Sequence, residues 1–157
     1  MRSPKIHKRL KMKKLLLVLF AVLSLQANGI IVKKSNCDTY QTVQNLKKII
    51  KAKGLHIFAV INHSGNAKAV GMKMRPTVMI VFGKAELGTK LMQQDPKVGL
   101  DLPLRVLVYE DKDGSTKMAY RDGSWLKNKH VIDAPKIIQK INKGMDTITT
   151  QAGICHK

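Results

Sequence analysis

The sequence predicts an α+β fold, with one antiparallel five-stranded sheet and two long helices packed on one of its faces. Five short apolar runs bounded by turn residues are typical of strands. Two longer segments carry apolar residues at helical spacing. An Asp-Gly step within residues 110–115 indicates a hairpin loop. The resulting order of elements suits one sheet with both long helices on the same side.

The first predicted elements are a short strand over residues 30–32 and the first long helix. Ser35 or Asn36 is expected to cap this helix, with Asp38 in its first turn, where the helix dipole favours a negative charge. Gly54 is typical of a helix end. The helix itself is indicated by four apolar residues at helical spacing: Val43, Leu46, Ile49 and Ile50.

Two apolar runs follow, over residues 55–61 and 77–82, and both predict strands that are buried on both faces. The polar residues 62–66 separate the two strands. Residues 85–94 predict a short helix, which ends at the Asp-Pro step before residue 97.

The last part of the chain predicts strands over residues 104–109 and 116–121, a short helix over 124–129 and the second long helix. Asp133 is expected to cap that helix, with Pro135 in its first turn. Its apolar stripe is formed by Ile137, Ile141, Met145 and Ile148. Two helices cover one face of the sheet only, so the other face is expected to be covered by the short middle helix and by a second copy. The sequence therefore predicts a homodimer.

The first 27 residues are predicted to be a secretory signal peptide. Seven basic residues precede an apolar run over 15–25, and the small residue Ala27 stands before Asn28, where we expect cleavage. Met12 is an alternative start that gives a compact signal peptide. The apolar run is shorter than the roughly 20 residues of a membrane span. We therefore expect one periplasmic or secreted domain, residues 28–157, with no transmembrane segment after signal cleavage.

The charge of the chain indicates which partners suit it. The formal net charge is +19, with 29 basic and 10 acidic residues. Seven basic residues lie in the predicted signal peptide, so the rest of the chain keeps 22 basic and 10 acidic residues, a net charge of +12. This charge favours an anionic small molecule or envelope component, although lysines also serve solubility. Export and few aromatic residues argue against nucleic acid.

The two cysteines, Cys37 and Cys155, both lie in the predicted exported part. An oxidising compartment allows a disulfide between them, but the sequence does not show whether their Cα atoms come close enough. His156 could join Cys155 as a ligand for a soft metal, although two ligands do not make a metal site.

His63 is the first candidate for a functional side chain. It follows an apolar strand, where an imidazole can point into a cleft and bind a ligand or metal, or move a proton. A capping or core-edge histidine is the alternative. Met72 and Met74 could offer thioethers to copper(I), but alternating apolar residues of a strand give the same pattern, and we expect these methionines to pack in the core.

No catalytic motif is evident in the sequence, which lacks a nucleophile elbow, a phosphate-binding loop and a dinucleotide fingerprint. The ten acidic residues are scattered and offer little for acid–base catalysis. We therefore expect a non-catalytic ligand-binding or interaction protein without a cofactor. The alternative is a small envelope enzyme, or a metal- or redox-handling protein, that uses His63.

Several central segments occur in a specific order: Arg75-Pro76-Thr77, Val81-Phe82-Gly83, Leu87-Gly88-Thr89-Lys90-Leu91-Met92 and Gly99-Leu100-Asp101-Leu102-Pro103-Leu104. Together they resemble the domain-of-unknown-function 302 family over residues 30–133. The resemblance implies a TATA-binding-protein-like β-α-β4-α fold and a tendency to dimerise, and it implies no established activity.

Two departures from the family pattern concern the expected site. The family usually has Asp-His where this chain has Asn62-His63, and Asn-Pro where it has Lys84-Ala85. The first removes a carboxylate beside the histidine, and the second adds a positive charge. We expect a ligand-binding cleft in this region, bordered by His63, Lys84, Thr89 and the loop 99–103 that contains Asp101.

Overall fold

The computed structural model describes residues 29–155 of the chain. The predicted signal peptide, the alternative start at Met12 and the metal candidate His156 lie outside these residues. The chain divides into two units, residues 1–30 and 31–157. All of the elements below belong to the second unit.

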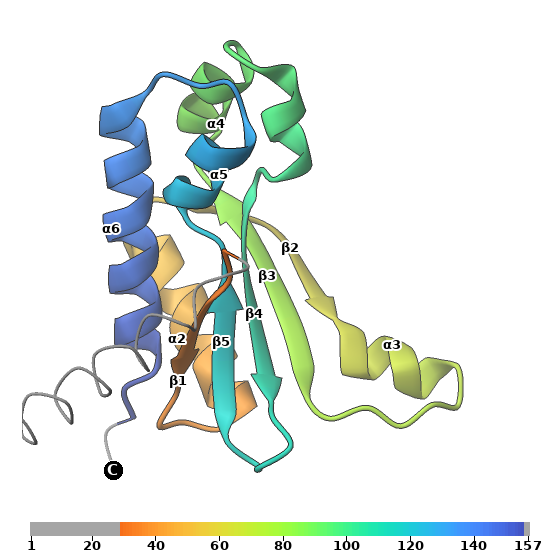
Figure 1. The fold of residues 1–157 in the computed structure, drawn as a ribbon. Helices are drawn as coiled ribbons and strands as arrows, with labels where there is room; N and C mark the ends of the chain where they lie inside the picture. Colours follow the sequence, from red (N-terminus) through yellow and green to blue (C-terminus); the bar gives the residue numbers. More distant parts are fainter. Residues whose placement is uncertain (1–28, 156–157) are drawn as a thin grey trace, which may run out of the picture. The chain divides into compact units, whose positions relative to one another are not determined.

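The second unit contains one five-stranded sheet, in which every neighbouring pair of strands is antiparallel (Figure 1). The order across the sheet is β1-β5-β4-β3-β2, so the first strand pairs with the last. This arrangement confirms the predicted sheet. The strands are β1 (Ile31–Lys34), β2 (His56–Asn62), β3 (Thr77–Gly83), β4 (Leu104–Glu110) and β5 (Thr116–Tyr120).

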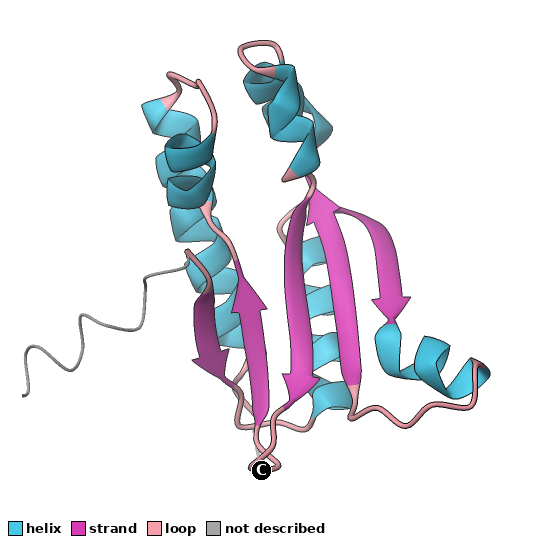
Figure 2. Cartoon of the chain, turned by 45° about the vertical axis from the view of Figure 1, so that its right-hand side comes forward, coloured by secondary structure: helices cyan, strands magenta, loops and turns pink. Residues whose placement is uncertain are grey.

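The two long helices, α2 (Thr39–Ala52) and α6 (Pro135–Ala152), pack against each other and lie on one face of the sheet (Figures 1 and 2). Their apolar stripes and the facing side chains of the sheet form the core, as the predicted α+β fold requires. The core includes these fully buried side chains: Leu46, Ile50, Ile80, Phe82, Val106, Val108, Met145 and Ile148.

Shorter helices connect these elements. They are α3 (His63–Ala69), α4 (Ala85–Met92), the 3₁₀ helix η2 (Pro96–Leu100) and α5 (Gly123–Lys129). Without them, the order of elements is the β-α-β4-α order that the family resemblance implies. The sequence predicted a polar break at residues 62–66, whereas the structure has helix α3, which the side chain of Asn62 caps by accepting a hydrogen bond from the Gly65 N–H at 2.8 Å.

The caps of the two long helices differ from the prediction. Asp38, and not Ser35 or Asn36, caps α2, because its carboxylate accepts a hydrogen bond from a backbone N–H of the first turn. At α6 the cap position is Ala134, without a side-chain hydrogen bond, and not Asp133. The boundaries of both helices are otherwise close to those expected.

A disulfide joins Cys37 and Cys155, whose Cα atoms lie 5.4 Å apart. It links the residue before the cap of α2 to the segment that follows α6. The backbone supports the same approach, since the Asn36 N–H donates to the Gly153 carbonyl at 2.9 Å. The pairing that the sequence left open is therefore present in the structure.

Candidate ligand-binding site

An apolar pocket of about 490 Å³ lies at the end of the sheet where β3 ends and β4 begins. Helices α4 and α6 form two of its walls, and the segment before β4 forms a third. Its volume is in the range of small-molecule sites, roughly 300–1,000 Å³. The apolar lining is formed mainly by Leu55, Phe58, Phe82, Leu87, Leu91, Met92, Leu102, Pro103, Ile141, Met145 and Ile148.

Gly144 lines this pocket from the middle of α6. It continues the apolar stripe of the helix, three residues after Ile141 and four before Ile148. A Cβ atom at this position would meet no heavy atom within 4 Å. Glycine in a helix interior costs about 1 kcal/mol relative to alanine, and here no close packing requires it. The missing side chain therefore enlarges the pocket at the expense of helix stability.

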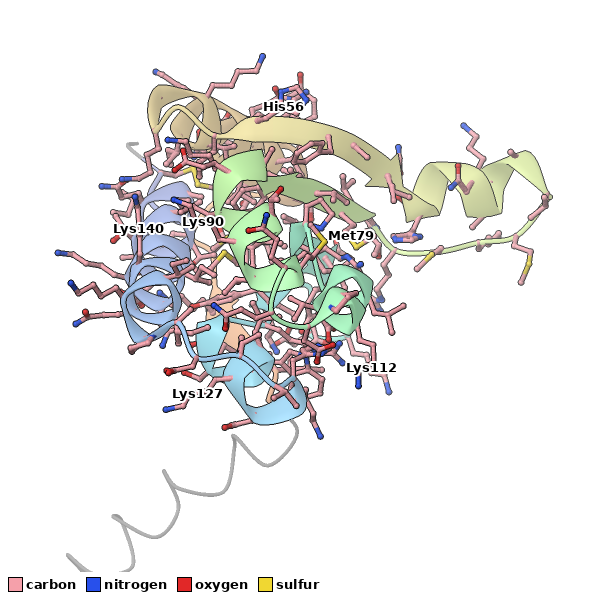
Figure 3. The ribbon with its side chains drawn as sticks, turned by 90° about the horizontal axis from the view of Figure 1, so that it is seen from above. His56, Met79, Lys90, Lys112, Lys127 and Lys140 are labelled. Carbon is pink, nitrogen blue, oxygen red and sulfur yellow. A yellow bond between two sulfur atoms is a disulfide. The ribbon has the colours of Figure 1, made fainter. Side chains whose placement is uncertain are left out.

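Three lysines line the pocket beside its apolar walls: Lys53, Lys84 and Lys140. Figure 3 looks onto this end of the molecule and labels Lys140 on α6 and Lys90 on α4. Lys84 Nζ lies 3.8 Å from a carboxylate oxygen of Glu86, and Lys53 and Lys140 form no ion pair among the described residues. Cations next to an apolar interior suit a ligand with an apolar body and one anionic group.

The charge of Glu86 is itself held by lysines. Lys90 Nζ lies 3.0 Å from its other carboxylate oxygen. The hydrogen bond from Lys90, together with the charges of Lys90 and Lys84, lowers the pKa of Glu86. Glu86 therefore stays ionised near neutral pH and neutralises part of the positive field at α4.

His130 fixes the wall that precedes β4. Its Nε2 lies 2.7 Å from Asp101 Oδ2, and its Nδ1 lies 3.7 Å from Asp95 Oδ2. The imidazole is buried, with 8% of its side chain exposed. Asp95 and Asp101 flank η2, so this contact holds the turn, and the Leu102 and Pro103 that follow it, against the residues after α5.

Both carboxylates are held in their ionised form. Burial alone raises the pKa of Asp101, but the hydrogen bond with His130 and the charges of His130 and Arg121 outweigh burial and lower it. Burial also raises the pKa of Asp95, but the backbone N–H groups of Val131 and Lys97 donate hydrogen bonds to its carboxylate and lower the pKa below its ordinary value. The imidazole of His130 therefore faces two ionised carboxylates, those of Asp95 and Asp101.

The structure brings together part of the site expected from the sequence. Lys84 and Thr89 line the apolar pocket, as do Leu102 and Pro103 from the expected loop. Asp101 belongs to that loop, but its carboxylate points to His130 instead of lining the pocket.

His63 lies at the opposite end of β2 from the pocket. The pocket end of β2 is His56, which pairs with Gly83, whereas Asn62 pairs with Val78 and is followed by His63 in α3. The neighbours Asn62 and Ser64 line a separate, more open hollow of about 770 Å³ with more polar walls. The structure therefore does not bring His63 to Lys84 and Thr89.

Met72 and Met74 are exposed, so the prediction that they pack in the core is wrong. The two residues are 66% and 51% exposed, and neither lies in a strand. The chain leaves the sheet through α3 and returns to it only at Thr77, which keeps both methionines away from the core. Within residues 29–155, no three His, Cys, Asp or Glu side chains are grouped so that they could hold a metal ion.

The sequence reasoning missed Lys53, His130, Lys140 and Gly144. A signal existed for Gly144, because it occupies a position of the apolar helical stripe at which a larger apolar residue is expected. The contacts of His130 join residues 29 and 35 positions apart and leave no local pattern. Lys53, directly after α2, and Lys140, in α6, resemble the other exposed lysines in and beside the long helices.

Comparisons with known proteins identify a family that matches this sequence and a solved structure with a similar fold. A family model described as "Domain of unknown function DUF302" matches residues 31–148. The crystal structure of an uncharacterized conserved DUF302 protein from Bacillus stearothermophilus is similar with a TM-score of 0.64 and 16% identity, covering 81% of this chain and 97% of that one. At this identity the likeness shows the fold alone. No helix within the described residues is long and apolar enough to cross a membrane.

Two curated relatives carry the names of ion channels. "Fluoride-specific ion channel FluC 1" of Brucella suis biovar 1 (strain 1330) is 31% identical over 127 residues, which is 80% of this chain and 50% of that protein. "Fluoride-specific ion channel FluC 2" of Brucella melitensis biotype 1 is also 31% identical over 127 residues, 80% of this chain and 47% of that protein. The chain thus spans about half the length of the curated relatives it matches.

Proposed function

The chain belongs to the DUF302 family, and we propose that it is an exported, non-catalytic binding protein that holds a small ligand in the apolar pocket between α4 and α6. The observation that carries the proposal is Gly144, whose missing side chain leaves space in the pocket that no neighbour fills. Lys53, Lys84 and Lys140 favour a ligand that joins an apolar body to one anionic group.

Two features support export to the periplasm. The first 27 residues have the charge and hydropathy pattern of a signal peptide. The disulfide between Cys37 and Cys155 would persist in an oxidising compartment and would be reduced in the cytosol. Detection of a mature protein that starts near Asn28 in the periplasmic fraction would test this part of the proposal, and an intact amino terminus on cytoplasmic protein would contradict it.

The names of the curated relatives support an envelope setting, since an ion channel acts in a membrane. The match covers about half of each relative, so fluoride conduction is not part of the function proposed for this chain. The proposal takes from these names only an envelope location for this chain.

The test of the pocket is Gly144→Leu. Leucine at this position fills the open space, and it also favours the helix by about 1 kcal/mol over glycine. Binding of anilinonaphthalene sulfonate, an aromatic body with one sulfonate, reports on the pocket by fluorescence. We expect the dissociation constant to rise about tenfold or more, the equivalent of about 1.4 kcal/mol, while the melting temperature does not fall. Unchanged probe binding by this variant would contradict the proposal.

Matched variants separate the pocket from the rival site. Lys140→Ala should weaken probe binding in a salt-dependent way, because it removes a cation beside the anionic group. His63→Ala should leave probe binding unchanged, since His63 lies at the other end of β2. Stoichiometric copper or zinc on the purified protein, lost in His63→Ala, would instead favour a metal-handling envelope protein.

A further inference from the structure

The segment between β2 and β3 projects from the sheet as an arm (Figures 1 and 2). It comprises residues 63–76, namely α3 and the loop that leads to β3, and is called the basic arm below. No residue of α3 is buried, and among the described elements α3 contacts β3 most. Figure 3 shows the arm extending beyond the body of the domain.

The outer part of the basic arm places large apolar side chains in solvent. Residues 68–76 are all exposed. Val70 is 72% exposed, Met72 66% and Met74 51%. The loop is nonetheless ordered by backbone hydrogen bonds, because Ala67 O accepts from both the Val70 and Met72 N–H groups. A clustered set of exposed apolar side chains on an ordered projection is typical of a contact surface.

The charged residues of the basic arm all have the same sign. Lys68, Lys73 and Arg75 alternate with the apolar residues, and residues 63–76 contain no acidic residue. Arg75 contacts Glu110 at 3.1 Å, while Lys68 and Lys73 form no ion pair among the described residues. Apolar tips between basic side chains match a bilayer interface, where the tips enter the acyl boundary and the basic groups meet anionic headgroups.

We propose that the basic arm docks this protein on an anionic phospholipid bilayer through Val70, Met72 and Met74, with Lys68 and Lys73 on the headgroups. The arm lies at the other end of β2 from the apolar pocket, so the docking is independent of the ligand proposed above. A second copy of the chain is the poorer occupant, because a symmetric contact through this arm would bring two sets of cations together without acidic partners.

Sedimentation of the exported protein with phospholipid vesicles tests the docking. Vesicles of phosphatidylcholine mixed with phosphatidylglycerol should carry the protein down, and vesicles of phosphatidylcholine alone should not. Lys68→Gln with Lys73→Gln should weaken this partition about fivefold per lysine. Val70→Ser with Met72→Ser and Met74→Ser should weaken it about tenfold or more.

Matched controls alter exposed apolar and basic residues elsewhere in the domain. Leu100→Ser with Val131→Ser removes two apolar side chains that are 76% and 81% exposed, and Lys48→Gln with Lys51→Gln removes two exposed lysines of α2. Neither control should change the partition, and all variants should keep the native melting temperature. Sedimentation of the serine variant like the native protein, or an equal loss in the controls, would overturn the proposal. A third outcome would also overturn it: the native protein does not sediment with the vesicles, and the arm variants have a lower mass in solution than the native protein. The arm would then be a contact between copies.

Discussion

The residue His130 supports the pocket wall from outside the pocket. Its two ring nitrogens face carboxylates that flank η2, Asp95 and Asp101. Because Leu102 lines the pocket directly after Asp101, the imidazole acts on the ligand site without touching it. His130 is therefore a positioning residue in the proposed function.

His130→Ala should lower both the stability of the domain and the affinity of its pocket. The substitution removes a hydrogen bond between an imidazole and a carboxylate, which costs about 1.5–3 kcal/mol. The free energy of unfolding, measured by urea denaturation, should fall by that amount, and anilinonaphthalene sulfonate should bind more weakly. His63→Ala is the control and should change the free energy of unfolding by less than about 0.5 kcal/mol. If the two substitutions changed the free energy of unfolding and the probe affinity equally, His130 would not be a positioning residue for the pocket.

The lowered pKa values of Asp95 and Asp101 predict how stability depends on pH. Each carboxyl has a lower pKa in the folded protein than the ordinary value of about 3.9 in the unfolded chain. Their contribution is therefore fully present above that value and is lost as the pH falls through the folded pKa. The free energy of unfolding should decrease below about pH 4, and Asp101→Asn should make this decrease shallower. The same slope in both proteins would contradict the prediction.

Two glycines on the helices should respond to alanine in opposite directions. A Cβ atom on Gly123, at the start of α5, would lie 2.7 Å from the Ile138 carbonyl oxygen and 2.8 Å from Asn142 Oδ1. The backbone of α6 would have to shift to make room for this Cβ atom, so Gly123→Ala should destabilise the domain by about 1–3 kcal/mol. Gly144→Ala meets no atom within 4 Å and should stabilise α6 by about 1 kcal/mol. Thermal denaturation measures both, and a shift of the same sign in the two variants would contradict the account of α5 packing.

The strands and long helices could be predicted because burial imposes a period on their residues. Leu46 and Ile50 mark the buried stripe of α2, and Met145 and Ile148 that of α6. Helix α3 could not be predicted in this way, because it buries no residue and therefore has no apolar stripe. It depends on the cap at Asn62, a residue that is equally typical of a turn.

The candidate site could be predicted in part for a topological reason. Lys84 follows β3, and Thr89 lies within the next helix, so both remain at the end of the sheet where β3 stops. His63 follows β2, which runs antiparallel to β3, and this alone places His63 at the opposite end of the sheet. The contact between His130 and Asp101 depends on packing across two helices, which no short pattern encodes.

At the scale of the whole molecule, one face of the sheet carries no helix, as Figure 2 shows. The register of the five strands places one apolar residue of each strand in a continuous row on this face. The row is Ile61, Met79, Leu107, Ala119 and Val32. It offers a second copy an apolar surface that is separate from the basic arm and from the pocket.

We therefore expect a homodimer formed through the open face of the sheet. Light scattering on residues 28–157 should give about twice the monomer mass at micromolar concentration. Leu107→Lys places a charge in the middle of the row and should give a monomer with an unchanged fold, because a buried unpaired charge opposes association. Lys48→Gln is the control, because Lys48 lies on α2, on the side of the sheet that carries the helices. It should leave the mass unchanged. A native protein that is monomeric throughout would contradict the prediction.

The disulfide between Cys37 and Cys155 has a consequence for proteolysis. It closes the chain into a covalent ring that contains all of the elements from α2 to α6. A protease that cuts after Lys68 or Lys73 in the exposed arm therefore produces two fragments that remain tethered. Limited trypsin digestion should give a product that migrates as one chain without reductant and as two pieces with it. A protein built in this way can lose the continuity of its backbone at the arm and still keep both parts of its sheet together.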